Sequence, residues 1–197
     1  MKEFKESHIQ PIWHVIVLNL LTTCWYAPFW LFKNYRDLRR RSSESPALGY
    51  ALKPLSINEA AALGMNKKVH PVILTVLSFL PFVGPVAIAF FCKTAAQLYP
   101  DTHSLIRKHP IVAGINLAAL IFLTLCLGRL PDPFYFFYLT ATIPMCICQH
   151  WLNCYWRSIE PNKLLVRQSF SSVELVLLIF GIGLVGMHIV QHFFIGK

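Results

Sequence analysis

The sequence predicts an all-α, polytopic integral membrane protein that forms a single membrane domain over residues 1–197. The chain is 55% hydrophobic and only 14% charged, whereas soluble domains carry about 25% charged residues. Four apolar runs are long enough to cross about 30 Å of hydrocarbon as helices. A further apolar run contains helix-breaking prolines and a glycine. We therefore expect four transmembrane helices plus a broken hairpin that re-enters or kinks, with five transmembrane helices as the alternative.

The first predicted span, residues 11–32, contains no Asp, Glu, Lys or Arg, and Pro28 is expected to kink it near its exit. An aromatic and basic cluster follows. Such a junction is typical of a membrane surface with anionic headgroups, where aromatic rings anchor the helix and cations meet lipid. The predicted lipid-interface residues are Trp25, Trp30, Lys33, Tyr35, Arg36, Arg39, Arg40 and Arg41.

Residues 33–70 are predicted to form a basic cytoplasmic loop. Ser56 and Glu59 have the spacing of a capping box, so a short helix is expected at residues 58–63. The rest of the segment is interpreted as irregular.

The second apolar run, residues 72–92, contains Pro81, Gly84 and Pro85, which break a helix. Each arm would measure roughly 13 Å, about half the hydrocarbon thickness. If the run crosses the membrane, Lys and Arg divide almost evenly between the two sides. If it re-enters, most of them share one side, as the positive-inside rule requires. We therefore expect a broken hairpin, with both termini outside.

Three further spans are predicted at residues 111–127, 134–152 and 173–194. The first two are joined by the turn R-L-P-D-P at residues 129–133. Ser171 and Glu174 form a second capping box before the last span.

Three motifs together resemble a family of small, uncharacterised bacterial inner-membrane proteins. They are the aromatic exit W-Y-A-P-F-W-L-F-K-N-Y-R at residues 25–36, the turn L-P-D-P-F at residues 130–134, and Q-H-W-L-N at residues 149–153. The resemblance extends from Trp13 to about Gly186. It implies a multi-pass location in the bacterial inner membrane and no particular reaction.

Two pairs of side chains are candidate metal ligands. Cys146 and His150 lie on one helical face, which Cys154 extends. His188 and His192 form a second pair with helical spacing, which could hold a metal or haem with help from His8 or His14. The competing interpretation is ordinary helix packing for the first pair, and polar residues at the membrane interface for the second.

Small and polar residues within the spans are interpreted as packing features. Glycines at residues 181, 183 and 186 match G-x-G-x-x-G, but inside a membrane helix they favour close helix contact rather than nucleotide binding. Gly114 and Ala118 have the same role. Side chains predicted to hydrogen-bond between helices are Asn19, Asn116, Gln149 and Asn153.

No catalytic constellation is recognisable, so the sequence favours a protein that is not an enzyme and has no bound cofactor. No basic nucleic-acid-binding module is present either. Our hypothesis is an accessory or interaction component of a membrane assembly, whose partners are anionic lipid and another membrane protein. The alternatives are a small transporter or channel built around residues 81–85, and a metal- or haem-binding membrane protein.

Overall fold

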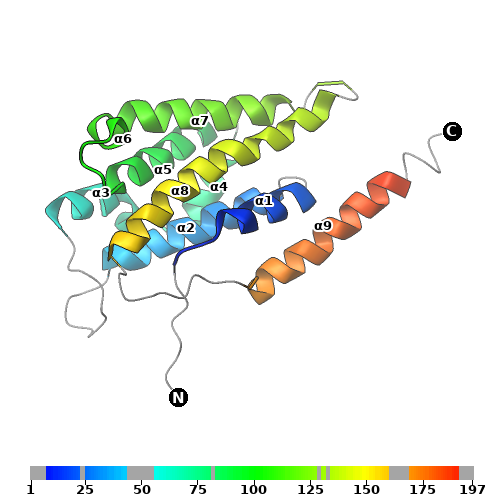
Figure 1. Cartoon of the computed structure of the whole chain (residues 1–197), viewed down its shortest axis with the longest axis horizontal. Coiled ribbons are helices and arrows are strands. Elements are labelled where there is room, and N and C mark those ends of the chain that lie inside the picture. Colours follow the sequence, from blue (N-terminus) through cyan, green and yellow to red (C-terminus); the bar gives the residue numbers. More distant parts are fainter. Residues whose placement is uncertain are drawn as a thin grey trace, which may run out of the picture.

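The computed structural model describes residues 8–22, 25–43, 56–80, 83–127, 130–131, 134–159 and 169–190, apart from a few side chains within them. Every regular element in these ranges is helical (Figure 1). The predicted all-α fold is confirmed. Among the described residues, no helix combines the length and the apolar character needed to cross a membrane.

The helices are arranged as a bundle with one outlying helix. In chain order they are α1 (Ile12–Leu21), α2 (Tyr26–Ser43), α3 (Ile57–Lys68), α4 (Pro71–Ser78), α5 (Gly84–Leu98), α6 (Leu105–Lys108), α7 (Pro110–Cys126), the 3₁₀ helix η2 (Phe134–Ala141), α8 (Thr142–Ile159) and α9 (Ser172–Val190). Helices α1, α2, α5, α7 and α8 make the bundle, and α9 lies outside it, in contact with α1 (Figure 1).

The first predicted span is two helices, so the expectation of one continuous helix over residues 11–32 is wrong. The chain leaves α1 at Thr22, whose hydroxyl donates to the Leu18 carbonyl at 2.7 Å and accepts from the Tyr26 amide at 2.9 Å. Pro28 then falls in the first turn of α2, where its missing N–H costs nothing. The chain reverses direction between α1 and α2 (Figure 1), so Gln10 lies beside α2, where its Oε1 atom accepts from Lys33 Nζ at 3.2 Å.

The basic segment after this turn is largely helical, which corrects the predicted loop over residues 33–70. Helix α2 continues to Ser43 because its buried residues recur every three or four positions, the spacing of an amphipathic helix. Helix α3 is also longer than expected. Its capping box is confirmed, since the Ser56 amide donates to Glu59 Oε2 at 2.8 Å and the Glu59 amide donates to Ser56 Oγ at 3.2 Å.

The second apolar run is broken as predicted, into α4 and α5. Gly84 is required at the break, because an added Cβ would lie 2.5 Å from the Ser78 carbonyl oxygen. Helices α4 and α5 contact each other across the break, and α3, which precedes α4, also packs against α5. Pro81 lies outside the described residues, and Pro85 is in the first turn of α5.

The three later spans coincide with helices. Helix α7 matches residues 111–127 within one residue at each end. The fourth predicted span corresponds to η2 followed by α8, which continues to Ile159. Helix α9 matches the last span up to Val190, and the remainder lies outside the described residues. The second capping box is confirmed, with the Ser171 amide 2.9 Å from Glu174 Oε2.

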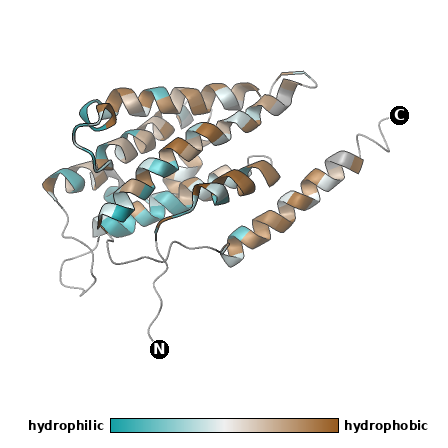
Figure 2. Ribbon diagram, viewed as in Figure 1, coloured by the Kyte–Doolittle hydropathy of each residue, from teal (hydrophilic) through white to brown (hydrophobic). Residues whose placement is uncertain are grey.

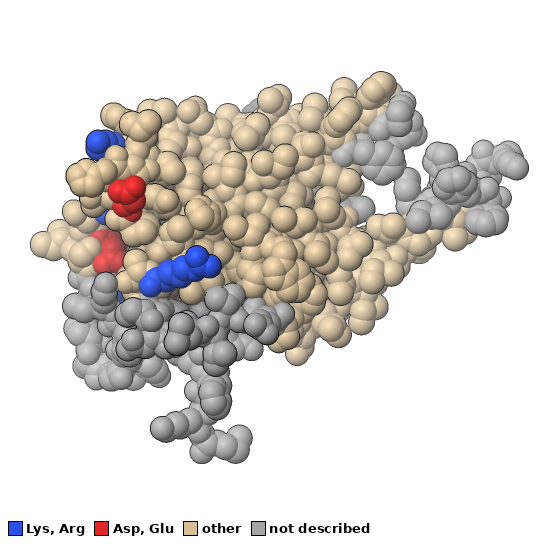
Figure 3. All heavy atoms as spheres, in the orientation of Figure 1, with Lys and Arg blue, Asp and Glu red and all other residues tan. Residues whose placement is uncertain are grey.

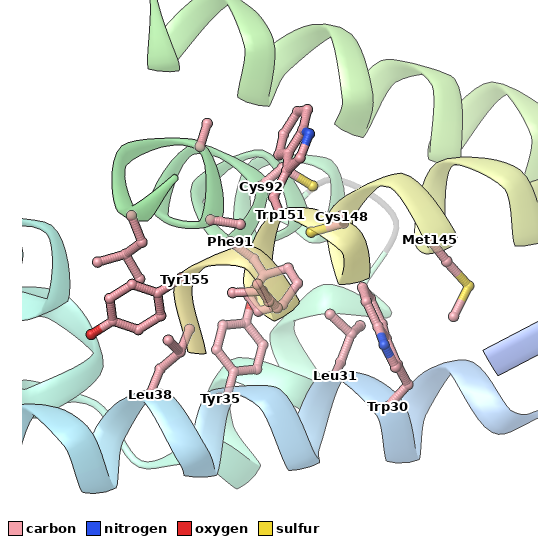
Figure 4. Packing of buried hydrophobic residues seen from close by; sticks show 14 of the residues in the cluster. Trp30, Leu31, Tyr35, Leu38, Phe91, Cys92, Met145, Cys148, Trp151 and Tyr155 are labelled. Atoms are coloured by element: carbon pink, nitrogen blue, oxygen red, sulfur yellow. The ribbon is translucent and has the colours of Figure 1, made fainter. Parts of the chain in front are cut away.

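The core lies between α2, α5 and α8 and is rich in aromatic rings and thiols (Figure 4). Phe91 of α5 packs edge-on against Trp30 at 5.4 Å and against Tyr35 at 4.9 Å between ring centroids. Such edge-to-face pairs add about 0.5–1.5 kcal/mol each beyond the area they bury. Cys92 and Cys148 are fully buried free thiols within the same cluster.

Polar and apolar residues are segregated along the bundle. The hydrophilic ends of α2, α5 and α8 lie together with α3 and α6, whereas the opposite end is apolar (Figure 2). On the face seen in Figure 3, the described charged side chains likewise gather toward that one end. Large apolar side chains remain exposed on the outer faces of α7 and α9, among them Ile115, Leu123, Val176, Ile179 and Met187.

Candidate functional site

A buried polar network lies where α1, α2, α8 and α9 meet, and it begins at Gln10. The Gln10 amide donates to Asn153 Oδ1 at 3.2 Å, and Asn153 Nδ2 returns a bond to the Gln10 carbonyl at 2.7 Å. Pro11 provides no amide of its own, so this reciprocal pair fixes the start of α1 against α8. Unsatisfied amides in an apolar interior would cost about 1–3 kcal/mol each.

The network continues across α8 to α2. Gln149 Nε2 donates to Asn153 Oδ1 at 2.9 Å, one helical turn away. Its Oε1 atom accepts from the indole N–H of Trp30 at 2.7 Å and from Asn34 Nδ2 at 3.4 Å. Both donors sit on the buried face of α2, and all four side chains are almost completely buried. This arrangement sets the register between the two helices.

The charged part of the network joins α2 to α9. Lys33 Nζ lies 3.5 Å from Glu174 Oε1 and donates to Gln10 Oε1 at 3.2 Å. The Glu174 side chain has an exposed fraction of 0% and that of Lys33 has 13%. Gln10 Nε2 also donates to the Tyr26 hydroxyl, and it lies 3.5 Å from Glu174 Oε1. Glu174 therefore caps α9 and ties its first turn to the bundle.

The predicted interhelical polar contacts are confirmed at three of four positions. Asn19 Nδ2 donates to Thr142 Oγ1 at 2.6 Å, and Gln149 and Asn153 act as described above. Asn116 is exposed on α7 instead. Sequence reasoning missed the roles of Gln10 and Lys33. A lysine among aromatic residues and a lone carboxylate at the start of an apolar helix were the available signals.

The predicted lipid-interface residues divide into two groups. Trp25 is exposed at the turn before α2, and its contact with lipid stays a prediction. Trp30 and Tyr35 are buried in the core, because the segment that carries them is a packed helix, and placing them at the lipid interface was wrong. Arg41 is also buried. Its Nε donates to the Tyr155 hydroxyl at 3.3 Å, and its Nη2 lies 3.9 Å from Glu59 Oε1, so it connects α2 to α8 and α3.

The other basic residues of α2 keep contact with the surface. Arg36 and Arg39 are half-buried and Arg40 is exposed. Arg36 Nε lies 3.3 Å from Asp37 Oδ1, so this carboxylate partly neutralises the charge of the guanidinium.

Of the two predicted metal-binding pairs, Cys146 with His150 lies on α8 within the described residues, whereas His188 with His192 does so only in part. His150 Nε2 lies 3.6 Å from Cys154 Sγ, and Cys146 is half-buried one turn earlier on α8. Among the described residues, no group of three or more His, Cys, Asp or Glu side chains is arranged to hold a metal ion. His188 belongs to α9, with a side chain outside the described set, and His192 lies outside the described residues, so a metal site there stays a prediction.

The predicted glycine contacts are confirmed only in part. A Cβ on Gly181 would lie 2.6 Å from the Leu21 carbonyl oxygen, so α9 crosses the end of α1 at this residue. Gly114 similarly lets the backbone of α5 at Lys93 approach α7 closely, because an added Cβ on Gly114 would lie 2.5 Å from the Lys93 amide nitrogen. Gly183 and Gly186 have no atom within 4 Å of an added Cβ.

An apolar groove lies beside the polar network, between α1 and the η2–α8 segment. Its volume is about 670 Å³. Its walls are aliphatic, and its few polar lining groups are Thr140, Thr142, Cys146 and His150. No local pattern in the sequence predicts this groove, because it forms only when α1 folds back alongside α8.

Comparison with known proteins identified no relative of this chain. No protein-family model matches the chain, and neither the curated proteins nor the solved structures contain a match. The arrangement of the described side chains therefore carries the functional argument. The buried network is suited to joining four helices, and the groove is suited to binding an apolar group.

Proposed function

We propose that this chain is an integral protein of the bacterial inner membrane that acts as an accessory component of a membrane assembly. The observation that carries the proposal is the segregation of its surface. Charged side chains gather toward one end of the bundle on the face seen in Figure 3, while large apolar side chains stay exposed along α7 and α9. Extended exposed apolar surface marks contact with membrane or protein, and basic residues at one end favour the cytoplasmic side.

Helix α9 supports the accessory role. It is anchored to the bundle through Glu174 and through the close approach at Gly181. Its other faces carry exposed apolar side chains such as Val176, Ile179 and Phe180. In this proposal those faces meet lipid and one transmembrane helix of another membrane protein. The basic end of the bundle meets anionic headgroups, whose attraction is worth about 1 kcal/mol per Lys or Arg near the surface.

Two measurements test the proposal. The full chain, expressed in a bacterial host, should stay in the membrane pellet after alkaline carbonate extraction. A photo-crosslinking amino acid at Ile179, which is 63% exposed, should then capture one membrane protein in stoichiometric yield. The same group at Ile115 of α7, which is 54% exposed, is the matched control. Release by carbonate, or identical capture patterns at both positions, would overturn the proposal.

A small transporter or channel is the second candidate, favoured by the two helix breaks. Broken helices that expose backbone groups at membrane depth form the binding sites of many transporters. Here the chain breaks between α1 and α2 and again between α4 and α5. Tyr35 lies close to both helices of the second break. Its hydroxyl is 3.5 Å from Ser78 Oγ of α4 and 3.2 Å from the Ala87 carbonyl oxygen of α5. Flux into reconstituted vesicles that is lost when Pro81 and Pro85 are both replaced by Ala would favour this function over the first.

A further inference from the structure

We infer that the groove between α1 and the η2–α8 segment binds one acyl chain of an anionic phospholipid. The inference rests on the proposed membrane location and specifies a ligand for a site that the accessory role does not require. Three properties of the groove carry it: its shape, its lining, and the charge at one of its ends.

The shape of the groove is set by two antiparallel rows of side chains. Ile12, Ile16 and Leu20 recur every four residues along one face of α1. The row on the other wall runs through Leu139, Ile143 and Ile147. The groove therefore follows the helix axes for about 12 Å, the rise of eight helical residues.

Hydrogen bonds join the two walls at one end of the groove and beyond its other end. Asn19 is bonded to Thr142 at the Leu20 end, and Gln10 is bonded to Asn153 beyond the Ile12 end. These bonds fix the relative position of α1 and α8, and with it the spacing between the two apolar walls.

The size and lining of the groove match a chain rather than a helix. Its volume of about 670 Å³ falls within the range of ligand pockets, about 300–1,000 Å³. A transmembrane helix of a partner is about 10–12 Å in diameter with its side chains, which is too wide for a groove between two neighbouring helices. A methylene chain is narrow and needs no hydrogen bonds, and each buried CH₂ contributes to binding.

The charge at one end identifies the headgroup. Beyond Ile147 the same face of α8 continues through His150, Cys154 and Arg157, at spacings of four and three residues. His150 and Arg157 are exposed, and α8 contains no acidic residue. This end also lies on the hydrophilic side of the bundle (Figure 2). A phosphate there would meet the Arg157 guanidinium and the His150 imidazole while its acyl chain occupied the groove.

The test uses the full chain in vesicles that contain phosphatidylglycerol with a photoactivatable diazirine on one acyl chain. Cross-linked peptides are then mapped by mass spectrometry. We expect labelling to concentrate on residues 12–20 and 139–150, and to fall roughly tenfold when Ile147→Trp fills the groove. Leu120→Trp on the outer face of α7 is the matched control, because Leu120 is 40% exposed and Ile147 is 38% exposed. Even labelling of α7, α8 and α9 would overturn the inference.

The headgroup is tested by competition between lipids. Phosphatidylglycerol should compete better than phosphatidylcholine, and Arg157→Gln should reduce that preference about two- to fivefold. Equal competition by the two lipids in the unmodified chain would overturn the anionic assignment. If carbonate leaves the chain in the membrane but the labelling is even, the groove inference is wrong and the membrane proposal stands. If carbonate extracts the chain, the membrane proposal itself is wrong.

Discussion

Lys33 Nζ lies 3.5 Å from Glu174 Oε1, so α2 holds the first turn of α9 through an ion pair that is almost completely buried. Both partners have further contacts: Gln10 accepts from Lys33, and the Ser171 amide donates to Glu174 Oε2. A buried ion pair pays a large desolvation cost and persists only when its remaining polar atoms are satisfied. This pair meets that condition, so it acts as a specific attachment point for a helix that otherwise touches little of the bundle.

Lys33→Met should destabilise the protein because it leaves the Glu174 carboxylate buried without its cation. Breaking a buried pair from one side costs about 3–5 kcal/mol. The loss is measured by thermal unfolding in detergent. Lys93→Met is the matched control, since that half-buried lysine has only a cation–π contact with Phe90. Equal losses for the two variants would show that the ion pair contributes nothing specific.

The double variant Lys33→Met with Glu174→Gln separates charge from packing. With both charges removed, no uncompensated ion stays buried, so the double variant should be more stable than Lys33→Met alone. Additive losses in the double-mutant cycle would contradict the coupling that the geometry implies.

Two glycines of α9 should respond in opposite ways to the same substitution. Gly181→Ala would place a Cβ 2.6 Å from the Leu21 carbonyl oxygen, so α9 must move away from α1. Overpacking of this kind costs about 1–3 kcal/mol. Gly183→Ala meets no atom within 4 Å and should stabilise the helix by about 0.5–1 kcal/mol, because alanine loses less backbone entropy. Thermal unfolding of both variants decides the point, and a loss of stability in Gly183→Ala would contradict the open surface around it.

Local patterns in the sequence predicted the helices well, because those patterns report local physics. Apolar length located both ends of α7 and the start of α9 within one residue, whereas the fourth predicted span covered η2 and only part of α8, which begins at Thr142 and ends at Ile159. The S-x-x-E spacing located the starts of α3 and α9, since a capping box needs only two residues that are three apart. The break between α4 and α5 followed from Gly84 and Pro85 for the same reason.

Features that depend on distant residues were not predictable. The reversal after α1 lies inside a continuous apolar run, and it is fixed by buried contacts such as Asn19 with Thr142. The amphipathic pattern that extends α2 was present in the sequence but was obscured by its high charge. The pairing of Lys33 with Glu174 and the apolar groove both require α1 to fold back, which no local pattern reports.

Trp30→Phe should lower the free energy of unfolding by about 1–2 kcal/mol, although an aromatic ring remains at this position. The substitution removes the indole N–H that donates to Gln149 Oε1 at 2.7 Å and leaves that buried acceptor with only the longer bond from Asn34. Trp13→Phe is the control, because Trp13 is half exposed on α1. The measurement is the free energy of unfolding in detergent. A neutral result for Trp30→Phe would show that Gln149 finds another donor, and the register between α2 and α8 would then depend on Asn153.

The reversal after α1 makes a topological prediction that differs from a single first span. If the chain lies in the inner membrane as proposed, the antiparallel packing of α1 and α2 should place His8 on the same side as Ser43, at the basic end, which the positive-inside rule assigns to the cytoplasm. Leu130, between α7 and η2, should face the opposite side. Single cysteines at these three positions in a cysteine-free chain are labelled with an impermeant maleimide in intact cells. We expect labelling at Leu130→Cys alone, with the other two positions reacting only after the membrane is opened. Labelling of His8→Cys in intact cells would mean that α1 and α2 cross the membrane as one span, and the groove between α1 and α8 would then not form.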